Sequence, residues 1–202
     1  MKITQNQYIN KSKSTKNVNN TQIFSNINNS CDISNGYLQS KNLILFNGVS
    51  EEMDCGGNST FEYAYFLLSN PQKSNINIYV KNSILTNLSS NPIISKIYYC
   101  VEDVIGNLES SNNISITNSN SNGSMPSAKI FFGNDIEKIY GIYGQNLIIP
   151  SYNMHNCFEN GSIIISPGFS YLFEIIPTNK EITSSFVMSF SWWEEPIPTF
   201  FD

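Results

Sequence analysis

The sequence predicts an all-β protein: an antiparallel two-sheet β-sandwich of the jelly-roll kind, with extended N- and C-terminal arms. From about Tyr37 onward, short runs rich in Ile, Phe, Tyr and Val alternate with turns of Asn, Gly, Ser and Pro. Roughly ten such runs occur, at the spacing expected for strands of a sandwich or barrel. Helical patterning is nearly absent, because apolar residues nowhere recur three and four apart over more than about two turns.

Each predicted strand is an apolar run that ends at a turn. In the last run, alternation predicts that Phe186, Met188, Phe190 and Trp192 face the core, and that Val187, Ser189, Ser191 and Trp193 face outward. Pro167 followed by Gly168 predicts a type II turn before it, since glycine tolerates positive φ. The runs are residues 41–48, 60–69, 75–81, 93–104, 113–117, 127–133, 136–144, 146–150, 162–177 and 183–195.

The chain divides into an arm, a single sandwich domain and a short tail. Residues 1–29 are polar, lack acidic side chains and show no lasting periodicity, which is typical of a flexible extended arm. Residues 30–195 hold all the predicted strands. Residues 196–202 form the tail, in which Pro196 and Pro198 end strand pairing and favour an extended path.

Composition argues against nucleic acid and membrane partners. All eleven basic residues are Lys, the net charge is −5, and the arginines that make bidentate contacts with phosphate and guanine are absent. No apolar segment approaches the roughly 18 residues of a membrane span, and the first residues have no signal-peptide pattern. The four scattered cysteines are therefore expected to be free, mostly buried thiols.

The stretch "SFSWWEEP", residues 189–196, raises the question of a catalytic carboxylate pair. Adjacent residues of a strand point to opposite sides of the sheet, so Glu194 and Glu195 cannot converge on one scissile bond. We therefore interpret them as charges that end a strand. With one histidine and no second acid pair, the sequence predicts no enzyme and no catalytic residue.

Two further groups of side chains are candidates for a metal or thiol site. His155 and Cys157 share a face if they lie in a strand, but no second histidine or nearby cysteine completes a zinc site, and a loop histidine is the preferred interpretation. The acidic residues Glu51, Glu52 and Asp54 could hold calcium, although their spacing is not that of an EF-hand. The sequence predicts no metal and no cofactor.

Docking residues are predicted at both ends of the chain. Trp193 is expected on the outer face, either covered by a loop of its own domain or part of an interface. Phe200 and Phe201, at the end of a proline-stiffened tail, are too apolar to be left in water. The arm contributes the four basic residues Lys2, Lys11, Lys13 and Lys16.

These features resemble jelly-roll virion proteins: the decoration, head-fibre and minor capsid proteins of tailed phages and other double-stranded DNA viruses. The resemblance rests on the basic arm, the single sandwich, "SIIISPGFSYLFEI" as a penultimate hairpin, and the closing strand "FVMSFSWWEEP". It implies a non-enzymatic structural subunit, made in the host cytoplasm and located in the virion. It also implies a homotrimer that attaches through its N-terminal arm to a major capsid or other virion protein.

A different class of function remains open. A carbohydrate-binding sandwich module would use exposed Trp193 and some of the eleven tyrosines to stack on sugars. An enzyme on a sandwich or barrel is the third class and the least supported, since it would normally carry several histidines or a clear acid pair.

Overall fold

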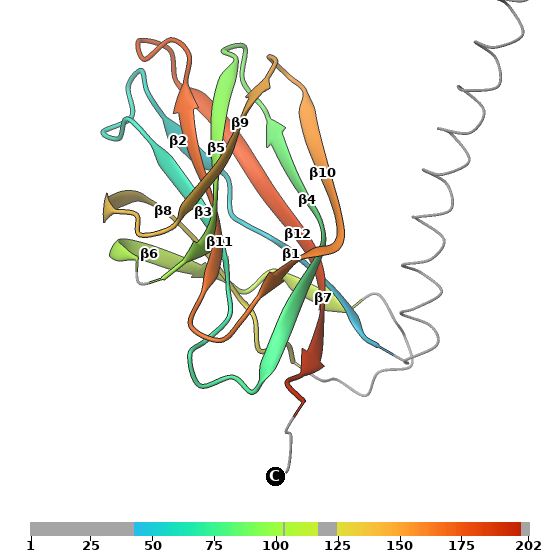
Figure 1. Cartoon of the computed structure of the whole chain (residues 1–202). Helices are drawn as coiled ribbons and strands as arrows, with labels where there is room; N and C mark the ends of the chain where they lie inside the picture. The colour runs from blue at the N-terminus through green and yellow to red at the C-terminus, as the bar shows by residue number, and fades with distance from the viewer. Residues whose placement is uncertain (1–42, 103, 117–124, 199–202) are drawn as a thin grey trace, which may run out of the picture. The chain divides into compact units, whose positions relative to one another are not determined.

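A computed structural model describes residues 43–102, 104–116 and 125–198, apart from the side chains of residues 105 and 135. The described residues form twelve strands and no helix (Figure 1), which confirms the predicted all-β class. One sheet, here sheet A, consists of β1 (Leu45–Val49), β2 (Met53–Cys55), β4 (Ile76–Asn87), β7 (Ile114–Ile116), β10 (Met154–Ile165) and β12 (Ser184–Pro196). The other, sheet B, consists of β3 (Ala64–Ser69), β5 (Ile93–Val101), β6 (Ile105–Ser111), β8 (Lys129–Lys138), β9 (Ile142–Ile149) and β11 (Ser170–Pro177).

Strand pairing follows a nested order. β1 pairs with β12, β3 with β11, β4 with β10 and β5 with β9, all antiparallel. A long hairpin folded over itself gives this order, because the first strand then meets the last and each inner pair lies further along. The pairs join laterally through β12–β4 and β11–β5. This eight-stranded frame has the topology of a jelly roll, as predicted, with β2, β6, β7 and β8 added at its margins.

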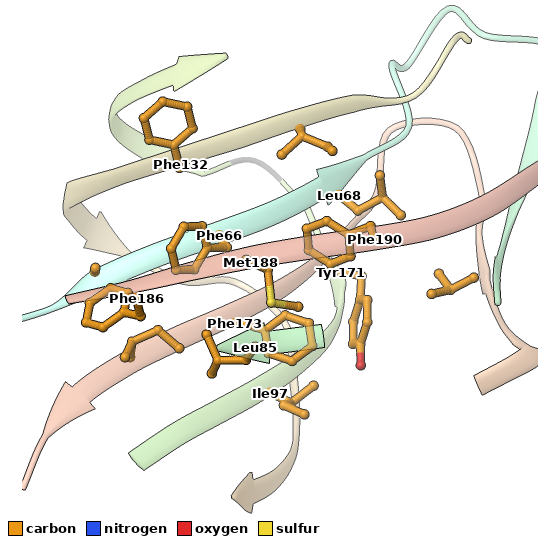
Figure 2. Packing of buried hydrophobic residues seen from close by; sticks show 14 of the residues in the cluster. Phe66, Leu68, Leu85, Ile97, Phe132, Tyr171, Phe173, Phe186, Met188 and Phe190 are labelled. Atoms are coloured by element: carbon orange, nitrogen blue, oxygen red, sulfur yellow. The ribbon is translucent and has the colours of Figure 1, made fainter. Parts of the chain in front are cut away.

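The core lies between the two sheets and is rich in aromatic side chains. Phe173 and Phe190 meet with ring centroids 5.9 Å apart, and Phe190 also contacts Tyr171. Figure 2 shows these rings packed with residues of both sheets. Fully burying a side chain of this size contributes about 1.5–3 kcal/mol, so the closing strand is central to stability. The predicted core set of β12 is confirmed as buried: Phe186, Met188, Phe190 and Trp192.

The Pro167–Gly168 turn also agrees with prediction, since Gly168 has a φ of +85° between β10 and β11. Several elements differ. β2 was not predicted, β4 continues beyond Lys81 to Asn87, and the predicted runs 136–144 and 146–150 become the end of β8 and the whole of β9. β10 begins at Met154, so the segment around His155, interpreted as a loop, is a strand that a bulge between Phe158 and Ile163 joins to the predicted apolar run. β6 was not predicted. Pairing of β12 continues through Pro196, which lies opposite Ile76.

Candidate functional site

Sheet A has an outer face that is nearly free of charge. The register places outward side chains of β10, β4, β12 and β1 in rows, for example Asn156, Ile84, Ser189 and Val49. These four strands contain four charged residues: Lys81, at the bulge of β4, and Glu159, Glu194 and Glu195. We call this surface face A; its members are Leu45, Asn47, Val49, Tyr79, Asn82, Ile84, Thr86, Met154, Asn156, Phe158, Ile164, Val187, Ser189 and Ser191.

Face A combines short polar side chains at its centre with apolar ones at its margin. Ser191 and Asn47 hydrogen-bond to each other across β12 and β1 at 2.5 Å. Met154, Phe158 and Ile164 lie along the edge strand β10 and are exposed, Phe158 by 66%. Edge strands of proteins that stay single are usually protected by charges. The one charged residue of β10 is Glu159, which accepts a hydrogen bond from Tyr171 on the inner side of the strand. The composition is that of an interface centre, where charged residues are depleted.

Trp193 does not form part of this exposed surface. Its side chain points to the outer side of sheet A, as predicted, but it is only 4% exposed. Its ring stacks on Tyr79 with centroids 5.3 Å apart and is covered by the backbone of Gly161, in the bulge of β10. The prediction of Trp193 as an exposed interface or sugar-stacking residue is therefore wrong, and the alternative of a tryptophan covered by its own domain holds.

The two glutamates that follow the tryptophans are structural acceptors. Glu194 accepts hydrogen bonds from the backbone N–H groups of Ser127 (3.0 Å) and Ala128 (2.9 Å), and from the indole N–H of Trp192 (3.2 Å). Glu195 accepts one from the indole N–H of Trp193 at 2.8 Å. Each carboxylate thus fixes the tryptophan two residues before it, on opposite sides of the sheet. The prediction that they form no convergent pair is confirmed.

The single histidine and its neighbouring cysteine do not form an activated thiol. His155 and Cys157 lie two residues apart in β10, opposite Leu85 and Ser83, so they share the inner side of the strand. Burial, and secondarily the charge of Glu159, raises the pKa of the Cys157 thiol to about 11. A thiol with this pKa is protonated near neutral pH and is a poor nucleophile.

The inner side of β10 also carries a half-buried carboxylate. The Tyr171 hydroxyl donates to Glu159 at 3.0 Å, and Tyr99 stacks on Tyr171 at a centroid distance of 5.5 Å. Burial raises the pKa of Glu159, and the hydrogen bond from Tyr171 offsets this only in part. The pKa of Tyr171 is also raised by burial, so burial shifts both groups toward their neutral forms.

Two of the acidic residues considered for calcium, Glu51 and Asp54, accept hydrogen bonds from other side chains of the domain. Asp54 accepts a hydrogen bond from the Ser185 hydroxyl, and Glu51 accepts one from the Asn113 amide at 2.8 Å. Among the residues that the structure describes, no three His, Cys, Asp or Glu side chains gather as a metal site requires. The described cysteines, Cys55, Cys100 and Cys157, are free; Cys100 is exposed, contrary to the expectation of mostly buried thiols.

Sheet B carries a polar cluster on its outer side that sequence analysis missed. Glu174 of β11 accepts from the Lys96 ammonium at 3.2 Å and from the Tyr98 hydroxyl at 2.9 Å, both at Oε2. The ring of Tyr143, on the neighbouring strand β9, meets Tyr98 edge-on at a centroid distance of 5.7 Å. Burial raises the pKa of Tyr98 to about 12, with a further contribution from Glu174. The phenol is therefore neutral and acts as a donor.

The remaining predicted docking residues, Lys2, Lys11, Lys13, Lys16, Phe200 and Phe201, lie outside the described residues. Among the described residues, no helix is long and apolar enough to cross a membrane.

The sequence profile of DUF6143, a family of unknown function, matches residues 7–199, so the chain belongs to this family. No curated protein matches the chain significantly.

Proposed function

We propose that the protein is a non-enzymatic structural subunit that associates with copies of itself through face A, as a component of a virion or similar particle. The observation that carries the proposal is the near absence of charge on this face. Sheet B provides an internal comparison, since its strands carry Lys96, Glu109, Lys129, Glu137 and Glu174.

The size of face A suits a stable contact. Four strands at a spacing of about 4.8 Å and lengths of about eleven residues at about 3.3 Å give a surface of roughly 700 Å². Specific interfaces bury about 800 Å² per partner. Homo-oligomeric interfaces resemble a domain core more than transient ones do, because the subunits need not stay soluble apart. This favours a second copy of the chain over an occasional partner.

The expected assembly is the homotrimer that the resemblance to virion proteins implies, with three such faces around the axis. The test is the mass of the purified full chain by light scattering and sedimentation. Ser189→Glu places a charge at the centre of face A on a half-buried, outward position. We expect the wild type to be an oligomer and this variant to be a monomer with an unchanged circular dichroism spectrum.

A matched control places the same charge on the other sheet. Ser110 of β6 is exposed and lies opposite Phe131 of β8. Both strands belong to sheet B, so Ser110→Glu leaves face A intact. The control is expected to retain the wild-type mass. A monomeric wild type at high concentration, or an oligomeric Ser189→Glu variant, would contradict the proposal.

The basic arm, residues 1–29, is the segment that we propose attaches the oligomer to a larger shell. An extended arm gains affinity by pairing its backbone with a strand edge, which needs no arginine. Deleting these residues is expected to leave the oligomer intact while it no longer cosediments with its particle. Cosedimentation of the truncated chain at the wild-type level would exclude this role.

A further inference from the structure

The outer side of sheet B presents its side chains in rows, because the register aligns β9, β5 and β11. In one row Tyr143 lies beside Tyr98, and in the next Asn146 lies beside Lys96, which lies beside Glu174. A third row contains Ile148, Ile94 and Ile176. Rows on one side of a sheet follow each other at about 7 Å. The surface therefore changes from aromatic to polar to apolar over a short distance.

A bulge aims Tyr143 at this surface. The register of β9 with β5 shifts between Ile97 and Tyr98, so that Gly144 is the extra residue. Without the shift, Tyr143 would lie opposite Tyr99, which points into the core. A Cβ on Gly144 would come within 2.8 Å of the Tyr99 Cδ2 atom, so glycine is required for both rings to pack. Bulges commonly redirect side chains at binding sites.

The polar row is held in a fixed arrangement. Glu174 is only 8% exposed although it lies on the outer side of the sheet. Its Oε2 atom holds both the Lys96 ammonium and the Tyr98 hydroxyl. A buried carboxylate that orients two more exposed groups is the support that a preorganised binding site requires, and all three groups lie on strands.

We propose that this surface binds neutral pyranose oligosaccharides, with Tyr98 and Tyr143 as stacking residues and Lys96 and Asn146 as hydrogen-bond donors to sugar hydroxyls. A pyranose ring has an apolar face of C–H groups and a polar rim. The two tyrosine rings meet at 66° and offer an apolar corner, and the polar row lies one step away. Tyr143 is 51% exposed, so its ring is open to a ligand.

The balanced charge of the site favours neutral sugars over acidic ones. Lys96 and Glu174 neutralise each other, so the site offers no unpaired cation to a uronic acid or a sulfated sugar. An ammonium already held by a carboxylate still donates its remaining N–H groups to hydroxyl oxygens. This site lies on the opposite sheet from face A and does not depend on the proposed self-association.

The test is to titrate the full chain with cellopentaose, maltopentaose and penta-N-acetylchitopentaose, and to measure binding by calorimetry and ligand-observed NMR. At least one of the three is expected to bind, with Tyr143→Ala lowering the affinity about tenfold or more. Tyr98→Phe keeps the ring but removes the bond to Glu174, and should lower the affinity less. Tyr152→Ala is the control, because Tyr152 is 73% exposed on the turn between β9 and β10 and lies in none of these rows.

The proposal is overturned if none of the three probes binds at about 10 mM, a concentration that would nearly saturate even a site with a dissociation constant of about 1 mM. It is also overturned if Tyr143→Ala, with a wild-type circular dichroism spectrum, binds as tightly as the wild type, or if Tyr152→Ala weakens binding equally. None of these results bears on the mass of the oligomer, so the two proposals fail separately.

Discussion

Gly161→Ala is expected to uncover Trp193 and to destabilise the protein more than an ordinary glycine substitution does. Gly161 lies in the bulge of β10 with a φ of +81°. A Cβ at this position would overlap the Trp193 ring, lying 2.9 Å from its Cζ2 atom. Either the ring leaves its place on Tyr79 or the bulge moves away from the sheet.

The magnitude has two parts that a second glycine separates. Gly168 also has positive φ, at +85°, but the nearest atom to an added Cβ is 3.5 Å away, an ordinary contact. Gly168→Ala therefore measures the conformational penalty alone, about 1–2 kcal/mol. A buried tryptophan removes about 150–250 Å² from water, worth about 4–6 kcal/mol at 25 cal/mol per Å². If half of that burial is lost, Gly161→Ala costs about 2–3 kcal/mol more than the control.

The assay is urea denaturation followed by tryptophan fluorescence, which is informative because the chain has only two tryptophans. Trp192 is fully buried in the core, so a red shift of native emission in Gly161→Ala reports Trp193. Gly168→Ala should retain wild-type emission. Equal losses of stability in the two variants, with unchanged emission in both, would refute the claim that the Gly161 backbone covers Trp193.

Three further predictions follow from buried groups. Phe190→Ala is expected to lower the unfolding free energy by about 3–5 kcal/mol in urea denaturation, whereas Tyr152→Ala, at an exposed turn position outside face A, should change it by less than about 0.5 kcal/mol. Burial raises the pKa of Glu159 in the folded state, so the protonated carboxyl contributes stability that is fully present below the unfolded pKa and is lost as pH rises through the folded pKa. Glu159→Gln cannot ionise and should not lose this stability. The unfolding free energy of the variant, relative to that of the wild type, should therefore increase from pH 4 to pH 7. Glu194→Gln should cost about 1–3 kcal/mol, since an amide cannot accept from Ser127, Ala128 and Trp192 together, and thermal melts should show a smaller cost for Glu195→Gln.

The sequence predicted the architecture because period-two alternation and turn residues are local signals. In β12, four alternate apolar residues were assigned to the core and all four are buried. The same alternation correctly placed Glu194 and Glu195 on opposite sides of the sheet. The pattern says which side of a sheet a residue takes, but not what covers that side. Trp193 was misjudged for this reason: Gly161, which covers it, lies more than thirty residues earlier in the chain.

The cluster around Glu174 was missed because register is not a local property. Tyr98 and Tyr143 come together only through the pairing of β5 with β9 and the shift at Gly144. A glycine within a strand pattern suggests a bulge, so "GIYGQN" contained the available signal, but the partner strand had to be known to interpret it. The segment from Met154 to Glu159 lacked β-branched residues and was interpreted as a loop; pairing with β4 makes it a strand.

The two proposals together predict that self-association strengthens sugar binding only on surfaces. Face A and the tyrosine surface lie on opposite sheets, so an oligomer joined through face A leaves every sugar site open. Linked weak sites gain apparent affinity when they engage one surface together, by a factor of about 10² or more. The Ser189→Glu monomer should therefore bind a soluble oligosaccharide as tightly as the wild type, yet elute from the corresponding immobilised polysaccharide at least tenfold earlier. The Ser110→Glu control should behave as the wild type in both assays. If the monomer is retained on the polysaccharide as strongly as the oligomer, binding there does not depend on several sites acting together, and the combined arrangement of the two faces is wrong.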